Sequence, residues 1–187
     1  VEEQQMENMR KMLMAMAKDI RVILIKMADR LHNMRTMAYQ SEEKQRIKSL
    51  ETMEIYAPIA HRLGMQKIKW ELEDLSLLYL DPAGYKAITD ALDERMPTLE
   101  KFMGEMRTQI RERLEAEGVH ATISSRIKHI YSIYRKMYAQ KLDINGIFDL
   151  CAFRVIVDTI PDCYNVLGII HDMYKPLPGR FRDYIST

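Results

Sequence analysis

Apolar residues recur every three to four positions from residue 1 to about Gly118, a spacing typical of amphipathic α-helices. Ser41 is suited to start one helix, Gly64 to end it, and Asp81 with Pro82 to start another. We expect a helical stretch over 83–117, broken near Pro97, and helices before it over residues 3–17, 19–39, 42–62 and 66–80. This part of the chain is predicted to be entirely helical.

After Gly118 the pattern alternates between strand-like and helix-like segments. The strand-like ones are "VHATISSR" (119–126), "FDLCAFRVIV" (148–157) and the final "FRDYIST", where another strand begins. "KHIYSIYRKMYAQK" is helical, as is "IPDCYNVLGIIHDMYKPLPG", which Pro161 and Asp162 open. We therefore expect an α+β protein of two domains with a seam near 110–120. The chain opens inside a helical pattern and closes inside a strand, so both ends read as cut from a longer polypeptide.

Composition adds few constraints. With 28 Lys+Arg against 27 Asp+Glu, no overall field attracts nucleic acid or an anionic membrane, so any anion site must be built locally. No apolar run approaches the roughly 20 residues that span a bilayer. Cys151 and Cys163 lack metal-ligand spacing, which favours a reduced, cytoplasmic setting.

One helix carries an unusual polar face. In "DIRVILIKMADRLHNMRTM" (19–37), Asp29, Asn33 and Thr36 are spaced to share one side of the helix. A purely structural amphipathic helix would serve equally well with Glu or Lys there. The pattern leaves open whether this face is simply solvated or forms the wall of a metal and nucleotide site.

A second constellation is basic. Lys128, Ser132 and Lys136 follow one another at intervals of four on one helix face. Arg126 precedes them at a strand-to-helix turn, where a helix N-terminus presents free N–H groups. This set of side chains suits a polyphosphate. Other cations lie nearby in the sequence, however, so the pattern alone slightly favours a solvated basic face without a ligand.

Asp149 opens the second predicted strand, and Arg154 follows five residues later. An aspartate here can hold Mg²⁺ against nucleotide phosphates, but one that caps a turn would look the same. An odd spacing puts the two side chains on opposite faces of an ideal strand.

Five blocks together resemble one known family: "IKMADRLHNMRT", "EIYAPIAHRLGMQKIKWELEDLSLLYL", "RIKHIYSIYRKM", "DLCAFRVIV" and "PGRFRDYI". In this order they look like the RelA/SpoT family of (p)ppGpp synthetase/hydrolases. The resemblance implies the end of an HD-type hydrolase domain (1–44), a helical connector (45–117) and the first part of a synthetase domain (118–187). The synthetase part would be a nucleotidyltransferase-like mixed β-sheet with flanking helices.

For the hydrolase, the resemblance implies removal of the 3′-pyrophosphate from (p)ppGpp with Mn²⁺ held by two histidines and two aspartates. Asp29 matches the last of these ligands, while Asn33 and Thr36 match residues that line the nucleotide. The other ligands are expected upstream of residue 1. His171-Asp172 comes after Asp29 in the chain, in the other domain, so we expect a structural role for that pair.

For the synthetase, the resemblance implies transfer of pyrophosphate from ATP to the 3′-hydroxyl of GDP or GTP. Arg126 and Arg154 match arginines that sandwich the adenine, and Asp149 matches the Mg²⁺ ligand. Arg182 matches a contact to the acceptor nucleotide. The contacts to the ATP phosphates match Lys128, Ser132 and Lys136.

Local details bear on the class within the family. "RFRD" (180–183) is the basic version of a motif that is acidic in synthetase-only members, and it therefore indicates the bifunctional class. Ser125 and Ile127 stand where the family has Gly and often Pro, which makes the position of Arg126 less certain than its identity. The acceptor-stacking tyrosine and the catalytic glutamate of the family are expected beyond Thr187, so the chain alone should be poorly active.

Two alternatives stay open: a synthetase with a decayed hydrolase, and a non-catalytic nucleotide-binding regulatory module. Ribosome or tRNA contact would come from C-terminal domains of the family that are absent here, and the oligomeric state stays undecided. We interpret Trp70 and "KWELEDL" (69–75) as connector packing and exposed charge.

Overall fold

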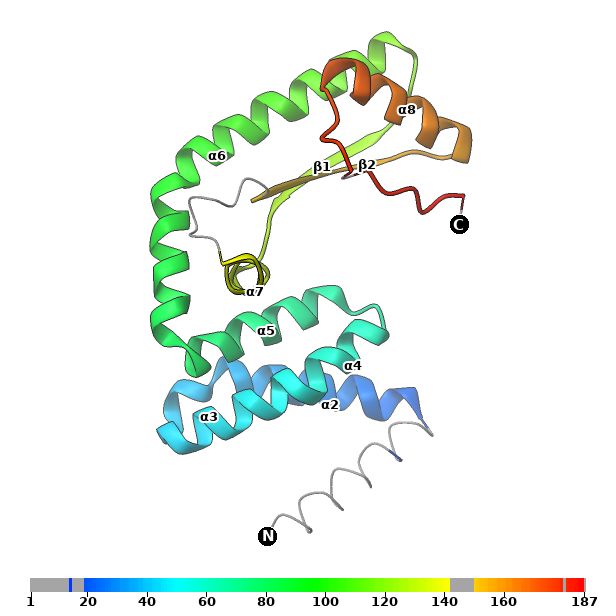
Figure 1. Ribbon diagram of the computed structural model, residues 1–187. Helices are drawn as coiled ribbons and strands as arrows, with labels where there is room; N and C mark the ends of the chain where they lie inside the picture. Colours follow the sequence, from blue (N-terminus) through cyan, green and yellow to red (C-terminus); the bar gives the residue numbers. More distant parts are fainter. Residues whose placement is uncertain (1–13, 15–18, 142–149, 180, 187) are drawn as a thin grey trace. The chain divides into compact units, whose positions relative to one another are not determined.

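A computed structural model describes residues 14, 19–141, 150–179 and 181–186 (Figure 1). It separates into two compact units, one of Val1–Thr89 with His129–Ala139 and one of Asp90–Lys128 with Gln140–Thr187. The elements are α2 (Ile20–Arg35), η1 (Met37–Tyr39), α3 (Glu42–Glu51), η2 (Thr52–Tyr56), α4 (Ala57–Arg62), α5 (Gln66–Leu80), α6 (Pro82–Ala116), β1 (Thr122–Ile127), α7 (Ile130–Gln140), β2 (Cys151–Ile156) and α8 (Ile160–Met173).

The helices begin and end close to the residues that the sequence predicts as their starts and ends. Gly64 takes a φ of +72°, the left-handed conformation that ends α4, and Asp81 and Pro82 begin α6. Ser41 stands at the N-cap of α3 but makes no side-chain cap hydrogen bond. Within the predicted helix 42–62, η2 is a π-helical turn at Thr52–Tyr56 that joins α3 to α4. The predicted helix over 3–17 lies outside the described residues, apart from residue 14.

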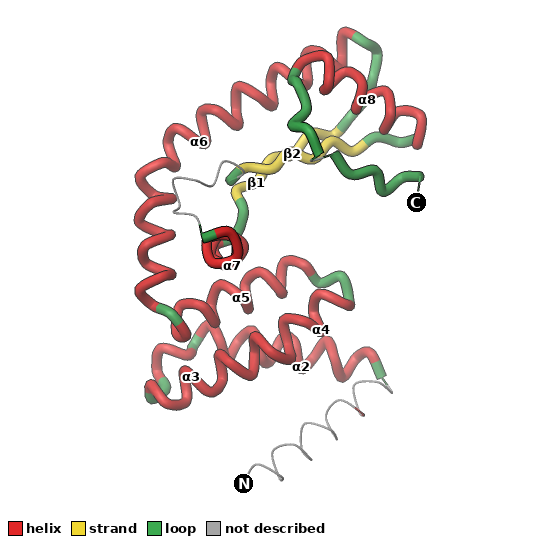
Figure 2. The backbone as a smooth tube through the Cα atoms, in the orientation of Figure 1, coloured by secondary structure: helices red, strands yellow, loops and turns green. Residues whose placement is uncertain are grey.

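Helix α6 is continuous through Pro97, so the predicted break is wrong (Figure 2). A proline inside a helix leaves the carbonyl four residues earlier without its N–H partner. Both Pro97 and Asp93 are exposed, so water can satisfy the carbonyl that Pro97 frees. The helix closes at Gly118, whose φ is +70°, as the sequence predicts.

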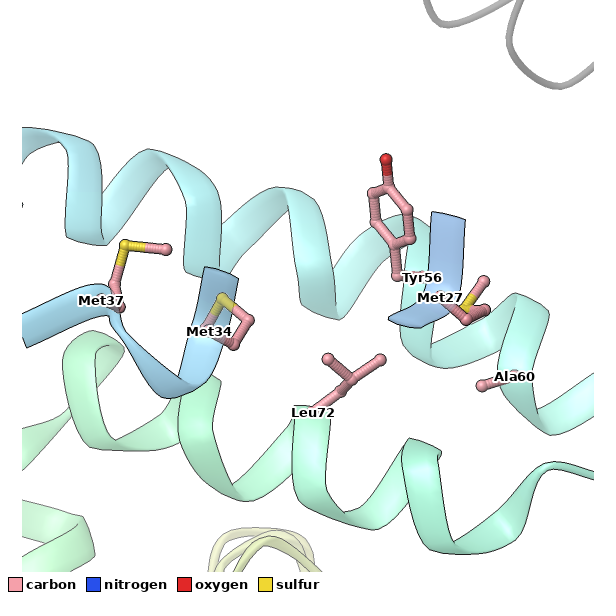
Figure 3. Packing of buried hydrophobic residues seen from close by; sticks show 6 residues of the cluster. All are labelled: Met27, Met34, Met37, Tyr56, Ala60 and Leu72. Carbon is pink, nitrogen blue, oxygen red and sulfur yellow. The ribbon is translucent and has the colours of Figure 1, made fainter. Parts of the chain in front are cut away.

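The core of the first unit lies where α2, η1, η2, α4 and α5 meet (Figure 3). Its methionine side chains are flexible enough to fill irregular gaps between the helices. At its edge, the Arg35 guanidinium on α2 pairs with the Glu71 carboxylate on α5 through two hydrogen bonds. The buried cluster consists of Met27, Met34, Met37, Tyr56, Ala60 and Leu72.

The second unit holds a small sheet in which β1 and β2 pair antiparallel. The inner face of this sheet packs against α6 and α8, and Phe153 packs on a buried cluster that includes Leu114 and Ile169. Thr159 caps α8 by accepting a hydrogen bond from the Asp162 amide at 3.2 Å. Helices and one sheet make the chain α+β, as predicted.

The strand predicted in "FRDYIST" is absent from residues 181–186, the described part of that segment. The Asp183 carboxylate accepts hydrogen bonds from the amides of Ile185 at 2.8 Å and Ser186 at 3.3 Å, which favours a turn over an extended strand. In the described part of the chain, no helix is long and apolar enough to cross a membrane.

Gly84 lies where a side chain would not fit. A Cβ atom there would come 2.5 Å from Asp81 Oδ2 and 2.8 Å from Tyr134 Cε2. We expect Gly84→Ala to destabilise the protein by about 1–3 kcal/mol, measured as a lower midpoint in thermal or urea unfolding. Gly104→Ala is the matched control in the same helix, because nothing lies within 4 Å of its Cβ position, and it should stabilise by about 0.5–1 kcal/mol. Equal effects at both positions would contradict the close approach.

Candidate nucleotide-binding and metal sites

The polar face of α2 is exposed, as its spacing predicts. Asp29, Asn33 and Thr36 all reach solvent, on the side of the helix opposite buried Met27 and Met34. The Asn33 amide donates a long hydrogen bond of 3.4 Å to Asp29 Oδ1, and the Thr36 hydroxyl donates to a backbone carbonyl one turn earlier. None of the three is consumed by packing, so the face can serve a ligand.

Arg30, which follows Asp29, anchors the helix from its buried side. Its side chain is 9% exposed, and its guanidinium pairs with Glu51 at 3.0 Å. The same guanidinium lies over the Tyr56 ring, 4.1 Å from the centroid. These two contacts fix the rotation of α2 and therefore the direction in which Asp29 projects.

The described residues do not by themselves form a metal site. Among them, no group of three or more His, Cys, Asp or Glu side chains lies close enough to hold an ion. Asp29 can supply one oxygen ligand, so a complete site needs ligands from elsewhere. Asp149 lies outside the described residues, and its role as a Mg²⁺ ligand stays a prediction.

Arg126 and Arg154 share the exposed face of the two-stranded sheet. Arg126 pairs with Ala152 and Ser124 pairs with Arg154, so the two arginines are diagonal neighbours. Diagonal neighbours are about 7–8 Å apart, roughly twice the 3.5–4 Å contact distance of stacked carbon atoms. This spacing of the strand positions leaves room for a flat ring of single-atom thickness between the two side chains when they extend side by side from the sheet.

Ser125, which stands where the family has glycine, adopts its backbone conformation without strain. Ser125 pairs with Phe153 in the ladder, and Lys128 extends the pairing by donating its amide to the Leu150 carbonyl at 2.8 Å. Extended backbone suits any residue, so no glycine is needed beside Arg126. Arg126 thus lies in β1 itself rather than in the turn to the helix. Arg182 is exposed on the C-terminal segment.

The N-terminus of α7 differs from the prediction, because its amides are already occupied. The carboxylate of Asp74 on α5 accepts from the Tyr131 amide at 2.7 Å and from the Ile130 amide at 3.4 Å. The next two amides, of Ser132 and Ile133, donate to the His129 carbonyl. All four amides of the first turn thus have partners, and a polyphosphate must be held there by side chains.

The neighbouring carboxylate, Glu73, is buried, so reading "KWELEDL" as exposed charge is wrong at this position. Glu73 lies 3.2 Å from His129 Nε2 and 3.5 Å from the Lys69 ammonium. Trp70 stacks on the His129 ring at 5.4 Å between centroids, which confirms its role in connector packing. The clue in the sequence was the apolar character of 72–80, which is too extensive for a helix with one solvated face.

Ser132 and Lys136 lie on α7, in the first unit, whereas Arg126, Lys128 and Arg154 belong to the second. The Ser132 hydroxyl lies 3.0 Å from His129 Nε2 and 3.3 Å from Nδ1, so it lies over the ring and is not aligned with one nitrogen, and Nε2 also faces Glu73. A nucleophile triad uses both ring nitrogens, one for the hydroxyl and one for the carboxylate. This arrangement is therefore a packing contact that orients the helix.

Burial raises the pKa of Asp74, and its hydrogen bonds to Tyr131 and Ile130 and the nearby His129 oppose that rise. The Asp81 carboxylate accepts from the Gly84 amide at 2.9 Å and the Tyr134 hydroxyl at 2.8 Å, and these bonds lower its pKa. Two carboxylates of the connector therefore hold α7.

The His171-Asp172 pair makes structural contacts, as expected. Asp172 pairs with Arg113 on α6 at 3.2 Å, and His171 meets Phe181 edge-on at 5.9 Å between ring centroids. Both contacts lie within the second unit.

Comparison with known proteins places these features in one family. Residues 1–66 match the model described as "HD domain", and residues 125–187 match "Region found in RelA / SpoT proteins". The chain belongs to the RelA/SpoT family.

Individual relatives are similar over nearly the whole chain. A GTP pyrophosphokinase of Myxococcus xanthus is 50% identical over 99% of this chain and 24% of its own length. The bifunctional (p)ppGpp synthase/hydrolase RelA of Mycobacterium tuberculosis is 47% identical over 96% of this chain and 24% of its own length. A guanosine-3′,5′-bis(diphosphate) 3′-pyrophosphohydrolase of Haemophilus influenzae is 46% identical over 100% of this chain and 28% of its own length. The chain thus spans about a quarter of the length of the curated relatives it matches.

Proposed function

We propose that this chain is the central segment of a bifunctional enzyme that makes and degrades (p)ppGpp in the stringent response. Its synthetase transfers pyrophosphate from ATP to the 3′-hydroxyl of GDP or GTP, and its hydrolase removes that pyrophosphate again. The family membership supports this, since relatives carry names for either activity or for both. The cytoplasm is the proposed location, because the substrates are found there and Cys151 and Cys163 are free thiols.

The observation that supports the synthetase assignment best is the diagonal placement of Arg126 and Arg154 on the exposed face of the two-stranded sheet. In the proposed complex their guanidinium planes stack on the two sides of the adenine, a task for which lysine is unsuited. Arg182 contacts the acceptor nucleotide. The ATP phosphates are bound by Lys128, Ser132 and Lys136.

In the proposed reaction the acceptor 3′-oxygen attacks the β-phosphorus of ATP while the bond from that phosphorus to the α–β bridging oxygen breaks. AMP leaves, and the acceptor hydroxyl loses its proton. The residues of this chain bind and align ATP and neutralise charge along its phosphates, which is the main contribution a protein makes to such transfers. Mg²⁺, for which Asp149 is the proposed ligand, would add further neutralisation.

For the hydrolase we propose that Asp29 supplies one ligand to Mn²⁺ while Asn33 and Thr36 bind the nucleotide. Their shared exposed face supports the proposal. Water is the attacking group, and pyrophosphate leaves the 3′-oxygen. The remaining metal ligands are proposed to come from other parts of the enzyme.

Calorimetry can test the adenine-binding role directly. We expect this chain to bind ATP in the presence of Mg²⁺, and Arg126→Ala or Arg154→Ala to weaken ATP binding about tenfold, because one stacked face is worth about 1–3 kcal/mol. Affinity for inorganic tripolyphosphate should change less than threefold. Arg107→Ala, which removes an exposed arginine of α6, is the charge-matched control and should leave both affinities unchanged.

Three results would contradict the proposal. The first is a wild-type chain that does not bind ATP. The second is that Arg126→Ala and Arg154→Ala bind ATP as tightly as the wild type. The third is that both variants lose affinity for ATP and for tripolyphosphate equally. Tight ATP binding that does not depend on Mg²⁺ would favour the regulatory module instead.

A further inference from the structure

Helix α7 begins without a capping residue of its own. His129 stands before its first residue, and histidine lacks the short oxygen-bearing side chain of the Ser, Thr, Asp and Asn residues that usually cap helices. The oxygens that accept from the first two amides instead come from Asp74, more than 50 positions earlier, at 2.7 Å and 3.4 Å. The start of α7 is therefore fixed by a helix of the connector.

Helix α5 lies between α2 and α7 (Figure 1), and four consecutive residues of α5 contact these two helices and the core. Glu71 pairs with Arg35 of α2, and Leu72 enters the buried core. Glu73 meets His129, and Asp74 caps α7. Because successive residues project about 100° apart, one short segment can face α2, the core and α7 at once.

The contacts made by Asp74 and Glu73 restrict two different motions of α7. The carboxylate of Asp74 holds its first amides and so limits sliding along the axis. The pairing of Glu73 with His129, which also stacks on Trp70, limits rotation about the axis. Ser132 and Lys136, on the first and second turns, have their positions set by this cap. Both Glu73 and the His129 side chain are largely buried, so the contacts are shielded from water.

We infer that Asp74, supported by Glu73, is a positioning residue for nucleotide binding: it holds α7 where Ser132 and Lys136 can meet the phosphates of ATP. The inference rests on the proposed synthetase function. It adds that ATP affinity is determined in part by a connector carboxylate that does not touch the nucleotide. The carboxylate of Asp74 also accepts from the Ile130 and Tyr131 amides, which a phosphate at this helix N-terminus would otherwise bind.

The test measures ATP affinity in the presence of Mg²⁺ by calorimetry for three variants of this chain. Asp74→Ala should bind ATP about tenfold more weakly, because small misplacements of binding groups are costly. Asp74→Asn should bind within about threefold of the wild type, since the carboxamide oxygen can still accept from the Tyr131 amide. Glu71→Ala, the matched control, removes a carboxylate of the same helix that faces α2 in an exposed pair, and it should change neither ATP affinity nor, by much, thermal stability.

Hydrogen exchange at the Ile130 and Tyr131 amides gives a readout that needs no nucleotide. Exchange should quicken in Asp74→Ala and stay unchanged in Glu71→Ala. The inference is overturned if Asp74→Ala binds ATP like the wild type, if Glu71→Ala weakens ATP binding equally, or if exchange at both amides is unaffected. A wild-type chain that does not bind ATP refutes the synthetase function instead, while the exchange result still decides whether Asp74 caps α7.

Discussion

In the proposed bifunctional enzyme, Asp29→Ala is expected to lower (p)ppGpp hydrolysis more than 100-fold while synthesis stays within about twofold. Removing even an outer partner of a metal ligand commonly costs 10–100-fold, so the loss of a ligand itself should cost more. The side chain of Asp29 is exposed and makes only the long contact to Asn33 in the described structure, so its removal should leave the fold intact. Initial rates of both reactions, measured on one preparation, provide the test.

Asp149→Ala should produce the reverse pattern, with synthesis lost and hydrolysis preserved. Asp93→Ala, at an exposed position of α6, is the control for the loss of a carboxylate and should change neither rate. The bifunctional assignment fails if either Asp29→Ala or Asp149→Ala abolishes both activities, or if neither activity responds. Hydrolysis that is absent from the unmodified enzyme would instead identify a synthetase with a decayed hydrolase.

The sequence predicted most elements because their signals are local. The bounds of α5 agree with the predicted helix 66–80, and Gly64 and Gly118 end helices in the left-handed conformation that glycine adopts readily. The shared face of Asp29, Asn33 and Thr36 follows directly from helical periodicity. These features depend on residues within two turns of one another.

The misjudged features depend on contacts or surroundings that no short window contains. Pro97 does not break α6, because solvent exposure makes the loss of one hydrogen bond tolerable. The free amides expected at the start of α7 are bound by Asp74, which lies far away in sequence. The placement of Arg126 and Arg154 on one face required the strand register, which the sequence does not supply. The binding assignments of these residues remain predictions that the experiments above decide.

Arg30→Ala is expected to destabilise the protein by about 3 kcal/mol, because it removes a buried guanidinium from its partners. The pair with Glu51 at 3.0 Å and the stacking on Tyr56 are lost together, and a void opens against the core of α2. Part of the cost is offset, since Glu51 keeps its exposed partner Lys48 at 2.9 Å. For a chain of this size the change corresponds to a fall of roughly 6–12 °C in the unfolding temperature, which calorimetry or circular dichroism can measure.

Arg21→Ala is the matched control, since it removes an arginine of the same helix whose ion pair with Asp19 is exposed to solvent. Exposed pairs contribute little, so the unfolding temperature should fall by no more than about 3 °C. Arg30→Met keeps most of the packing volume and should recover part of the stability that Arg30→Ala loses. If the anchor also orients Asp29, both Arg30 variants should lower hydrolysis by the proposed bifunctional enzyme at temperatures where they remain folded. Equal unfolding temperatures for Arg30→Ala and Arg21→Ala would show that the buried contacts of Arg30 do not hold α2 in place.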